Sequence, residues 1–256
     1  MIDGSKMIDH PIRRAMAGGG KGSQIGYIHR SSALRDSSFQ LVAGAFDINP
    51  ERGMQFSAKL GAGPSFALGD VGTHPLFIIE AMIPDMNIKN LMCTKRAFVE
   101  GRQLENNAFV IMNLNGSESV QDGAQVYCWA SSINCGARHY HKIRVVGSKA
   151  SIEWDDERPN QMSYEIEGEP VRILERGAGY LYPEARVENR IGGGYAEGLF
   201  EAWANLYRRF SFAMADADKG VYGDFWYPSV EAGAQGVKWI EKCVKSADNG
   251  AVWVDF

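Results

Sequence analysis

The chain has 256 residues, and 27 lysines and arginines stand against 31 aspartates and glutamates, so the formal net charge is −4. That length allows one large domain or two modest ones, and the mild acidity argues against a nucleic-acid partner, which needs a dense basic face. No apolar run approaches the roughly 18–20 residues of a membrane span, and the N-terminal residues lack the apolar region of a signal peptide, so we expect no membrane association.

The first 53 residues carry the pattern of one βαβ unit. Residues 12–17 form a strand candidate that runs into a glycine cluster. Apolar positions over residues 23–34 follow helical spacing, and residues 39–46 (FQLVAGAF) predict a buried strand. Strand, glycine turn, helix and strand in this order predict the opening of a Rossmann domain. The further alternating units of a complete domain do not follow.

The turn of this unit has the composition of a dinucleotide-binding loop. Its motif G-x-G-x-x-x-G follows the strand and opens the helix, where glycines allow the backbone to approach a pyrophosphate. Asp47 ends the second strand, where a carboxylate can accept hydrogen bonds from a ribose 2′-hydroxyl and would repel a 2′-phosphate. The alternative is a plain βα turn with a solvated Asp47. The candidate cofactor-binding residues are Gly18, Gly20, Lys21, Gly22, Ser23, Gly26 and Asp47.

A second motif, Gly69–His74, places a carboxylate and an imidazole four residues apart. We expect a loop over residues 61–69 and a helix that begins shortly before Pro75. Asp70 and His74 would then lie within one helical turn, as an acid/base pair that moves a hydroxyl proton requires. The alternative is a helix cap at Asp70 and a packed side chain at His74.

The rest of the chain predicts strands followed by two helices. Runs of β-branched and aromatic residues, separated by turn signals, predict a largely antiparallel sheet. The expected strands cover residues 88–98, 108–114, 125–131, 139–146, 151–154, 162–166, 170–174 and 251–254, and the expected helices cover residues 194–217 and 229–246. The predicted fold class is therefore α+β, a truncated Rossmann βαβ unit followed by a largely antiparallel open sheet flanked by helices.

The remaining histidines and the cysteines add no further predicted site. His139 and His141 would share one face of a strand and could bind a metal, but the sequence offers no third ligand, so we expect them at the surface and expect no metal. His29 is expected on a solvated helix face. The four cysteines show no CxxC pair and no zinc spacing, and free thiols fit a reducing cytoplasm.

Several stretches of the chain resemble the Gfo/Idh/MocA family of sugar and cyclitol oxidoreductases. The run AMAGGGKGSQIGYIHRSSALRDSSFQLVAGAFDINPERG resembles the start of that family's dinucleotide-binding domain. LGDVGTH resembles its substrate-site motif. The stretches FVEGRQLENNAFVIMNLNGS and HKIRVVGSKASIEW and the tail over residues 225–256 resemble its C-terminal sheet domain.

The resemblance implies a cofactor, a reaction and a set of site residues. The cofactor would be NAD or NADP, with NAD favoured by Asp47, and hydride would move reversibly at a hydroxyl carbon of a sugar or polyol. Asp70 and His74 would be the proton-transfer residues, and Arg102 would contact the substrate. The resemblance also implies a homo-oligomer assembled through the C-terminal sheet.

The resemblance breaks near residues 52–56, as if an internal segment were missing. We therefore divide the chain into a partial dinucleotide-binding domain, residues 1–53, and a sheet domain, residues 54–256. A complete Rossmann domain needs on the order of 130 residues, and the family's Glu-Lys-Pro motif, whose lysine lies beside the nicotinamide, does not occur in the sequence. Two hypotheses stay open. The chain is an oxidoreductase impaired by truncation, or a non-catalytic remnant that serves as an oligomerisation or sugar-binding module.

Overall fold

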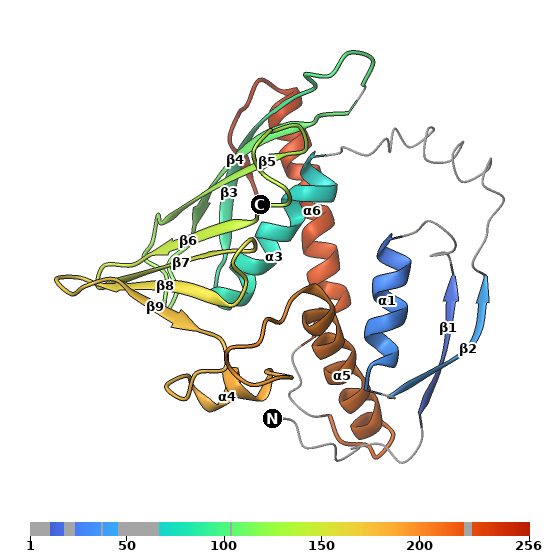
Figure 1. Ribbon diagram of the computed structural model, residues 1–256. Coiled ribbons are helices and arrows are strands. Elements are labelled where there is room, and N and C mark those ends of the chain that lie inside the picture. Colours follow the sequence, from blue (N-terminus) through green and yellow to red (C-terminus); the bar gives the residue numbers. More distant parts are fainter. Residues whose placement is uncertain (1–10, 18–23, 37, 46–66, 103, 223–226) are drawn as a thin grey trace. The chain divides into compact units, whose positions relative to one another are not determined.

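The computed structural model describes residues 11–17, 24–36, 38–45, 67–102, 104–222 and 227–256 (Figure 1). The chain divides into two compact units, each built from two stretches of sequence. The first unit combines residues 1–52 with residues 144–227, and the second combines residues 53–143 with residues 228–256. Within the described ranges, no helix has both the length and the apolar character needed to cross a bilayer.

The N-terminal part of the first unit is the expected βαβ arrangement. Strand β1 (Ile12–Ala17) leads to helix α1 (Gln24–Leu34) and then to strand β2 (Phe39–Ala45). The two strands pair in parallel, with Ile12 opposite Phe39, and the helix buries Ile28. Parallel pairing needs a crossover connection, which α1 supplies. The prediction of a βαβ opening is confirmed.

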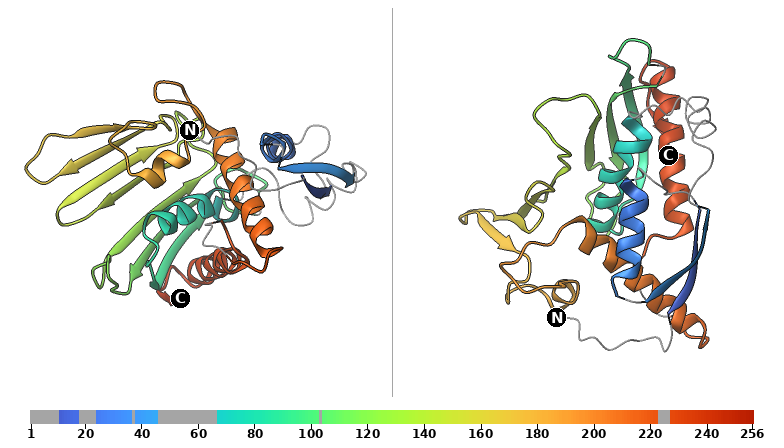
Figure 2. Two further views of the ribbon diagram at one scale, coloured as in Figure 1. Left: turned by 90° about the horizontal axis from the view of Figure 1, so that it is seen from below. Right: turned by 45° about the vertical axis from the view of Figure 1, so that its right-hand side comes forward.

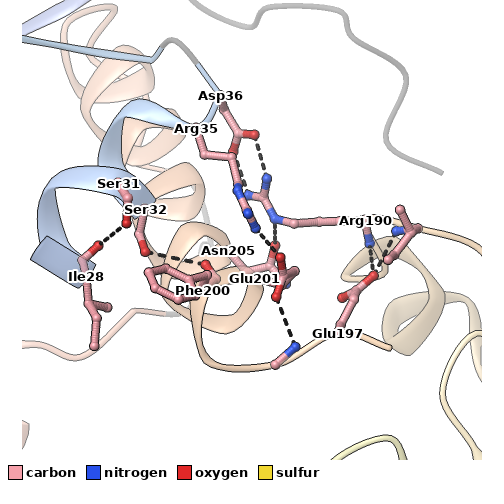
Figure 3. Close-up of polar contacts among 12 residues, drawn as sticks. Ile28, Ser31, Ser32, Arg35, Asp36, Arg190, Glu197, Phe200, Glu201 and Asn205 are labelled. Atoms are coloured by element: carbon pink, nitrogen blue, oxygen red, sulfur yellow. Dashed lines mark hydrogen bonds and ion pairs between the residues drawn. The ribbon is translucent and has the colours of Figure 1, made fainter. Parts of the chain in front are cut away.

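The remainder of the first unit holds a second sheet and two helices. Its sheet has the order β6-β7-β8-β9, formed by Lys142–Val146, Ala150–Asp155, Gln161–Ile166 and Arg172–Glu175, and the pairs β7–β8 and β8–β9 are antiparallel. A short helix that the sequence analysis missed, α4 (Pro183–Val187), precedes the long helix α5 (Leu199–Ala217). Helix α1 packs along α5, and polar side chains from both helices meet there (Figure 3).

The second unit is a sheet covered on one face by helices. The sheet has the order β10-β3-β4-β5, formed by Val254–Asp255, Ile88–Arg96, Asn107–Leu114 and Gln125–Ser131. Its described strand pairs are all antiparallel. Helix α3 (Thr73–Met82) and helix α6 (Val230–Asp248) lie against one face of this sheet (Figure 2). The core between them contains Leu76, Leu91, Met112 and Trp239, each at most 2% exposed.

The structure corrects two local predictions. Residues 67–69, expected in a loop, belong to the π-helical segment η1 (Ala67–Gly72), which continues directly into α3. Apolar burial explains this difference, because Ala67 and Leu68 are fully buried. Strand β6 begins only at Lys142, so His139 and His141 lie in the preceding loop and do not share a strand face. Tyr140, between them, has a φ of 54°, which an extended strand does not adopt.

Candidate functional site

The segment η1–α3 carries the two predicted proton-transfer residues, Asp70 and His74. Its first N–H groups bond to a single residue just before β4: Ala67 N–H donates to the backbone carbonyl of Glu105, and Leu68 N–H donates to the Glu105 carboxylate, each at 3.1 Å. The Thr73 hydroxyl donates to the carbonyl of Gly69 at 3.1 Å and closes the turn between η1 and α3.

Close packing fixes the far end of η1. A Cβ atom at Gly72 would lie 3.2 Å from the Trp239 ring and 3.4 Å from the Ala130 side chain, so only glycine fits there without displacing a neighbour. Gly72 is the residue between Asp70 and His74 where the helix passes from π to α geometry. The site therefore stands on the apolar core of the second unit.

Electrostatics at His74 favour the neutral imidazole. Partial burial, and then the charge of His139, lower the pKa of His74 from its ordinary value of 6.5, while the Asp70 carboxylate acts in the opposite direction. Asp70 and His74 both keep solvent-accessible side chains, so a substrate can approach them. A neutral imidazole with an adjacent carboxylate can accept a proton near neutral pH.

The His141 imidazole lies beside His74, and the His139 imidazole lies beside His141; the sequence analysis did not predict this cluster. The ring centroid of His141 lies 5.3 Å from that of His74, and the ring of His139 lies 4.3 Å from that of His141. The expectation of a surface position fits His139, which is exposed, whereas His141 is partly buried. More than sixty residues of sequence separate these rings from His74, so no local spacing could have revealed the cluster.

The structure describes only two of the other predicted site residues, Arg102 and Gly26. Arg102 is exposed in the connection between β3 and β4, and its contact with a substrate stays a prediction. Gly26 is buried inside the first turn of α1. The remaining predicted cofactor residues lie outside the described residues; these are Gly18, Gly20, Lys21, Gly22, Ser23 and Asp47.

The described residues around the predicted dinucleotide loop fit one half of a nucleotide site. Strand β1 ends at Ala17 and α1 begins at Gln24, so the glycine motif connects a parallel strand to a helix N-terminus. Such an N-terminus presents free N–H groups and a partial positive charge to a pyrophosphate. The first turn of α1 contains no acidic residue that would repel this ligand.

Comparison with known proteins decides the family. The family model described as "Oxidoreductase family, C-terminal alpha/beta domain" (GFO_IDH_MocA_C) matches residues 57–256, which is more than three quarters of the chain. This chain belongs to the Gfo/Idh/MocA oxidoreductase family. The match begins just after the predicted break in the resemblance at residues 52–56.

Individual relatives agree with this assignment. The chain is 32% identical to the "Uncharacterized oxidoreductase YfiI" of Bacillus subtilis, in an alignment that covers all of both proteins. It is similar to an inositol dehydrogenase homolog of Azotobacter vinelandii complexed with NAD+, with a TM-score of 0.89, 37% identity and complete coverage of both chains. An oxidoreductase of Pseudomonas syringae matches with a TM-score of 0.86 and 38% identity over 97% of this chain and 100% of its own.

The alignment with the Bacillus relative also confirms the missing segment. It spans 398 positions and covers both chains completely, whereas this chain has 256 residues. At least 142 aligned positions therefore have no residue in this chain. The chain combines a family-typical C-terminal domain with a shortened nucleotide-binding part.

Proposed function

We propose that this chain is a nicotinamide-dependent polyol oxidoreductase with a complete proton-transfer site and an incomplete cofactor site. The observation that carries the proposal is the nearness of Asp70 to His74, close enough to raise the pKa of an imidazole that burial lowers, on a segment anchored in the core. The Azotobacter relative has also been crystallised with NADH and myo-inositol, which supports a cyclic polyol as substrate.

In the oxidation direction, the neutral imidazole of His74 accepts the proton of the substrate hydroxyl. Hydride leaves the carbon that bears this hydroxyl, and the carbon–oxygen bond becomes a carbonyl. The negative charge of Asp70 favours the imidazolium that forms, consistent with its upward influence on the pKa of His74. A bound nicotinamide ring supplies the hydride acceptor.

The residues of this chain would hold such a cofactor from one side. The helix N-terminus of α1 and the preceding glycine motif would bind the pyrophosphate, and Asp47 would favour NAD over NADP. The family's lysine beside the nicotinamide has no counterpart in the sequence. We therefore expect slow turnover, since the ring that receives the hydride is poorly fixed.

The experiment is a nicotinamide-reduction assay with NAD and with NADP over a panel of cyclic polyols and sugars that includes myo-inositol. We expect turnover with NAD and a loss of about 100-fold or more in His74→Gln, because general-base catalysis is removed. Arg172→Ala, which breaks an exposed ion pair with Glu169 in the first unit, is the matched control. If neither cofactor supports turnover or raises the melting temperature, the oxidoreductase proposal fails.

A second candidate function is assembly through the face of the second unit's sheet that lies opposite α3 and α6. Phe109, Tyr127 and Trp129 are exposed there, and the rings of Phe109 and Trp129 stack with centroids 5.8 Å apart. None of the outward-facing positions of β4 and β5 is charged; they are Asn107, Phe109, Ile111, Asn113, Gln125, Tyr127, Trp129 and Ser131. An aromatic surface depleted of charge is typical of an interface core, and a second copy of this chain is the proposed occupant.

Light scattering tests this second candidate. A dimer or larger assembly should dissociate in Tyr127→Lys, which introduces a charge into the aromatic patch. Tyr182→Lys places the same charge at a somewhat more exposed tyrosine outside the sheets and should leave the assembly intact. A monomeric parent protein would exclude assembly through this face.

A further inference from the structure

Glu105 is a buried acidic residue that the proposed chemistry does not use. It lies just before β4, is 5% exposed, and touches the segment that carries Asp70 and His74. Both of its acceptor groups point to this segment, since its carboxylate accepts Leu68 N–H and its backbone carbonyl accepts Ala67 N–H. The first two N–H groups of η1 are therefore bonded to one residue.

These two bonds matter because a helix cannot satisfy its own first N–H groups. Leu68 and Ala67 are fully buried, so water cannot replace the missing acceptor. η1 is also π-helical, a rare geometry that occurs mostly as single turns and often at functional sites. A less common helical form needs outside contacts to persist in preference to an α-helix.

We propose that Glu105 is a positioning residue that holds η1 in its π-helical form and so sets where Asp70 and His74 lie relative to each other. The consequence for catalysis rests on the proposed function. The consequence for the position of His74 depends only on the hydrogen bonds between Glu105 and η1, and it can be measured in a protein without turnover.

The pKa of His74 reports on this positioning, because it depends on the groups that lie around the imidazole. Asp70 faces it from η1, and His139 and His141 face it from the loop before β6. A shift of η1 changes the solvent exposure of His74 and its separation from the Asp70 carboxylate and from these two imidazoles. The pKa of His74, lowered first by burial, would then move back towards its ordinary value of 6.5.

The test is an NMR titration of the five histidines in the full chain, assigned with single histidine variants. Glu105→Ala removes the carboxylate, and Glu105→Gln keeps an oxygen that can accept Leu68 N–H without the charge. Ser246→Ala is the matched control: Ser246 lies in the same unit and accepts the buried Cys93 N–H at 2.8 Å, far along the chain from η1. Glu105→Met removes the acceptor while filling the space, and replaces the alanine variant if that variant does not fold.

We expect the pKa of His74 to rise in Glu105→Ala or Glu105→Met and to stay at the parent value in Glu105→Gln and Ser246→Ala. Where turnover is measurable, kcat/KM should fall about 10-fold in the first pair, because small displacements of reacting groups are costly. An unchanged pKa in the first pair, or an equal rise in Ser246→Ala, overturns the inference. A rise in pKa without turnover in the parent protein would leave the positioning role intact and reject the proposed function.

Discussion

The two units of the molecule are stabilised by different kinds of contact. Seventeen of the twenty-one buried apolar side chains in the described part of the chain belong to the second unit, where Trp239, Leu91 and Met112 fill the space between sheet and helices. At the junction of α1 with α5 in the first unit, ion pairs and hydrogen bonds (the polar junction) accompany the packing of Tyr27 against Phe200 and the burial of Ile28. There the Arg190 guanidinium donates to both carboxylate oxygens of Asp36 at 2.6 Å, and Arg35 pairs with Glu201 (Figure 3).

This difference separates the two halves of the proposed reaction. The proposed proton-transfer residues lie on a segment packed against an apolar core, which contains no charged side chain that salt would screen. In the βαβ part, ion pairs and side-chain hydrogen bonds add to the apolar contacts, and these polar contacts weaken with ionic strength and with changes in protonation. We therefore expect the nucleotide-binding part to open under conditions that leave the site at His74 folded.

The largest expected effect comes from Trp239→Ala in the core of the second unit. The ring is fully buried, its Nε1 donates to the Met112 sulfur at 3.2 Å, and it packs against Gly72. Its removal should cost about 3–5 kcal/mol of unfolding free energy, measured by urea denaturation. Trp253→Ala is the control, since Trp253 is 45% exposed and should cost less than about 1 kcal/mol. Equal losses in the two variants would contradict the assignment of this core.

A smaller but more local effect is expected from Arg190→Ala at the polar junction. The side chain of Arg190 is 11% exposed and also donates from Nε to Asn205 at 2.7 Å, so its loss leaves Asp36 without its partner. We expect about 2–3 kcal/mol of local destabilisation, seen as faster hydrogen exchange of the α1 amides while β3 and β4 stay protected. Arg172→Ala, at an exposed pair, should change exchange little.

A double variant completes this test. Removing Asp36 together with Arg190 takes away the uncompensated carboxylate, so Arg190→Ala/Asp36→Ala should be less destabilised than Arg190→Ala alone. Additive losses from the two substitutions would show that the pair does not act as a unit.

The sequence predicted the local elements well and the long-range site poorly. Alternation in β5 and the strand–glycine–helix order of β1 and α1 are local signals, and the observed bounds follow them closely. The π-helical form of η1 has no local signal, since it depends on Glu105, more than thirty residues later in the chain. His141 beside His74 was missed for the same physical reason.

The prediction for His29, made from local sequence alone, was wrong because of tertiary contacts. A solvated face was expected for it, but its Nδ1 lies 2.7 Å from the Tyr207 hydroxyl and its ring packs edge-on against Trp203, with centroids 4.3 Å apart. Both partners come from α5. Their spacing in the sequence predicts an amphipathic helix, but it does not tell which element packs against the apolar face of that helix.

The smallest expected effect is a pH dependence of the stability of α1 that arises from His29. Burial, and then the nearby Arg14 charge, lower the pKa of His29 from 6.5 in the folded protein. The unfolded chain therefore binds more protons between the folded pKa and 6.5, so the contribution of His29 is complete above about pH 6.5 and is lost as the pH falls through the folded pKa. Because the ring is partly exposed, solvent screens the effect and we expect only a modest change.

Hydrogen exchange of the α1 amides at pH 7.5 and pH 5.5, corrected for intrinsic rates, measures this loss of protection. Burial raises the pKa of Glu201, but hydrogen bonds from Gly198 N–H and Arg35 outweigh it and hold the pKa below its ordinary value, so this carboxylate stays charged at both pH values. His29→Gln keeps an acceptor for the Tyr207 hydroxyl without titrating, and should remove the pH dependence of α1. His139→Gln, in the second unit, should not. If α1 in His29→Gln still loses protection on acidification to the same extent as in the parent protein, His29 is not the source of the pH response and this prediction fails.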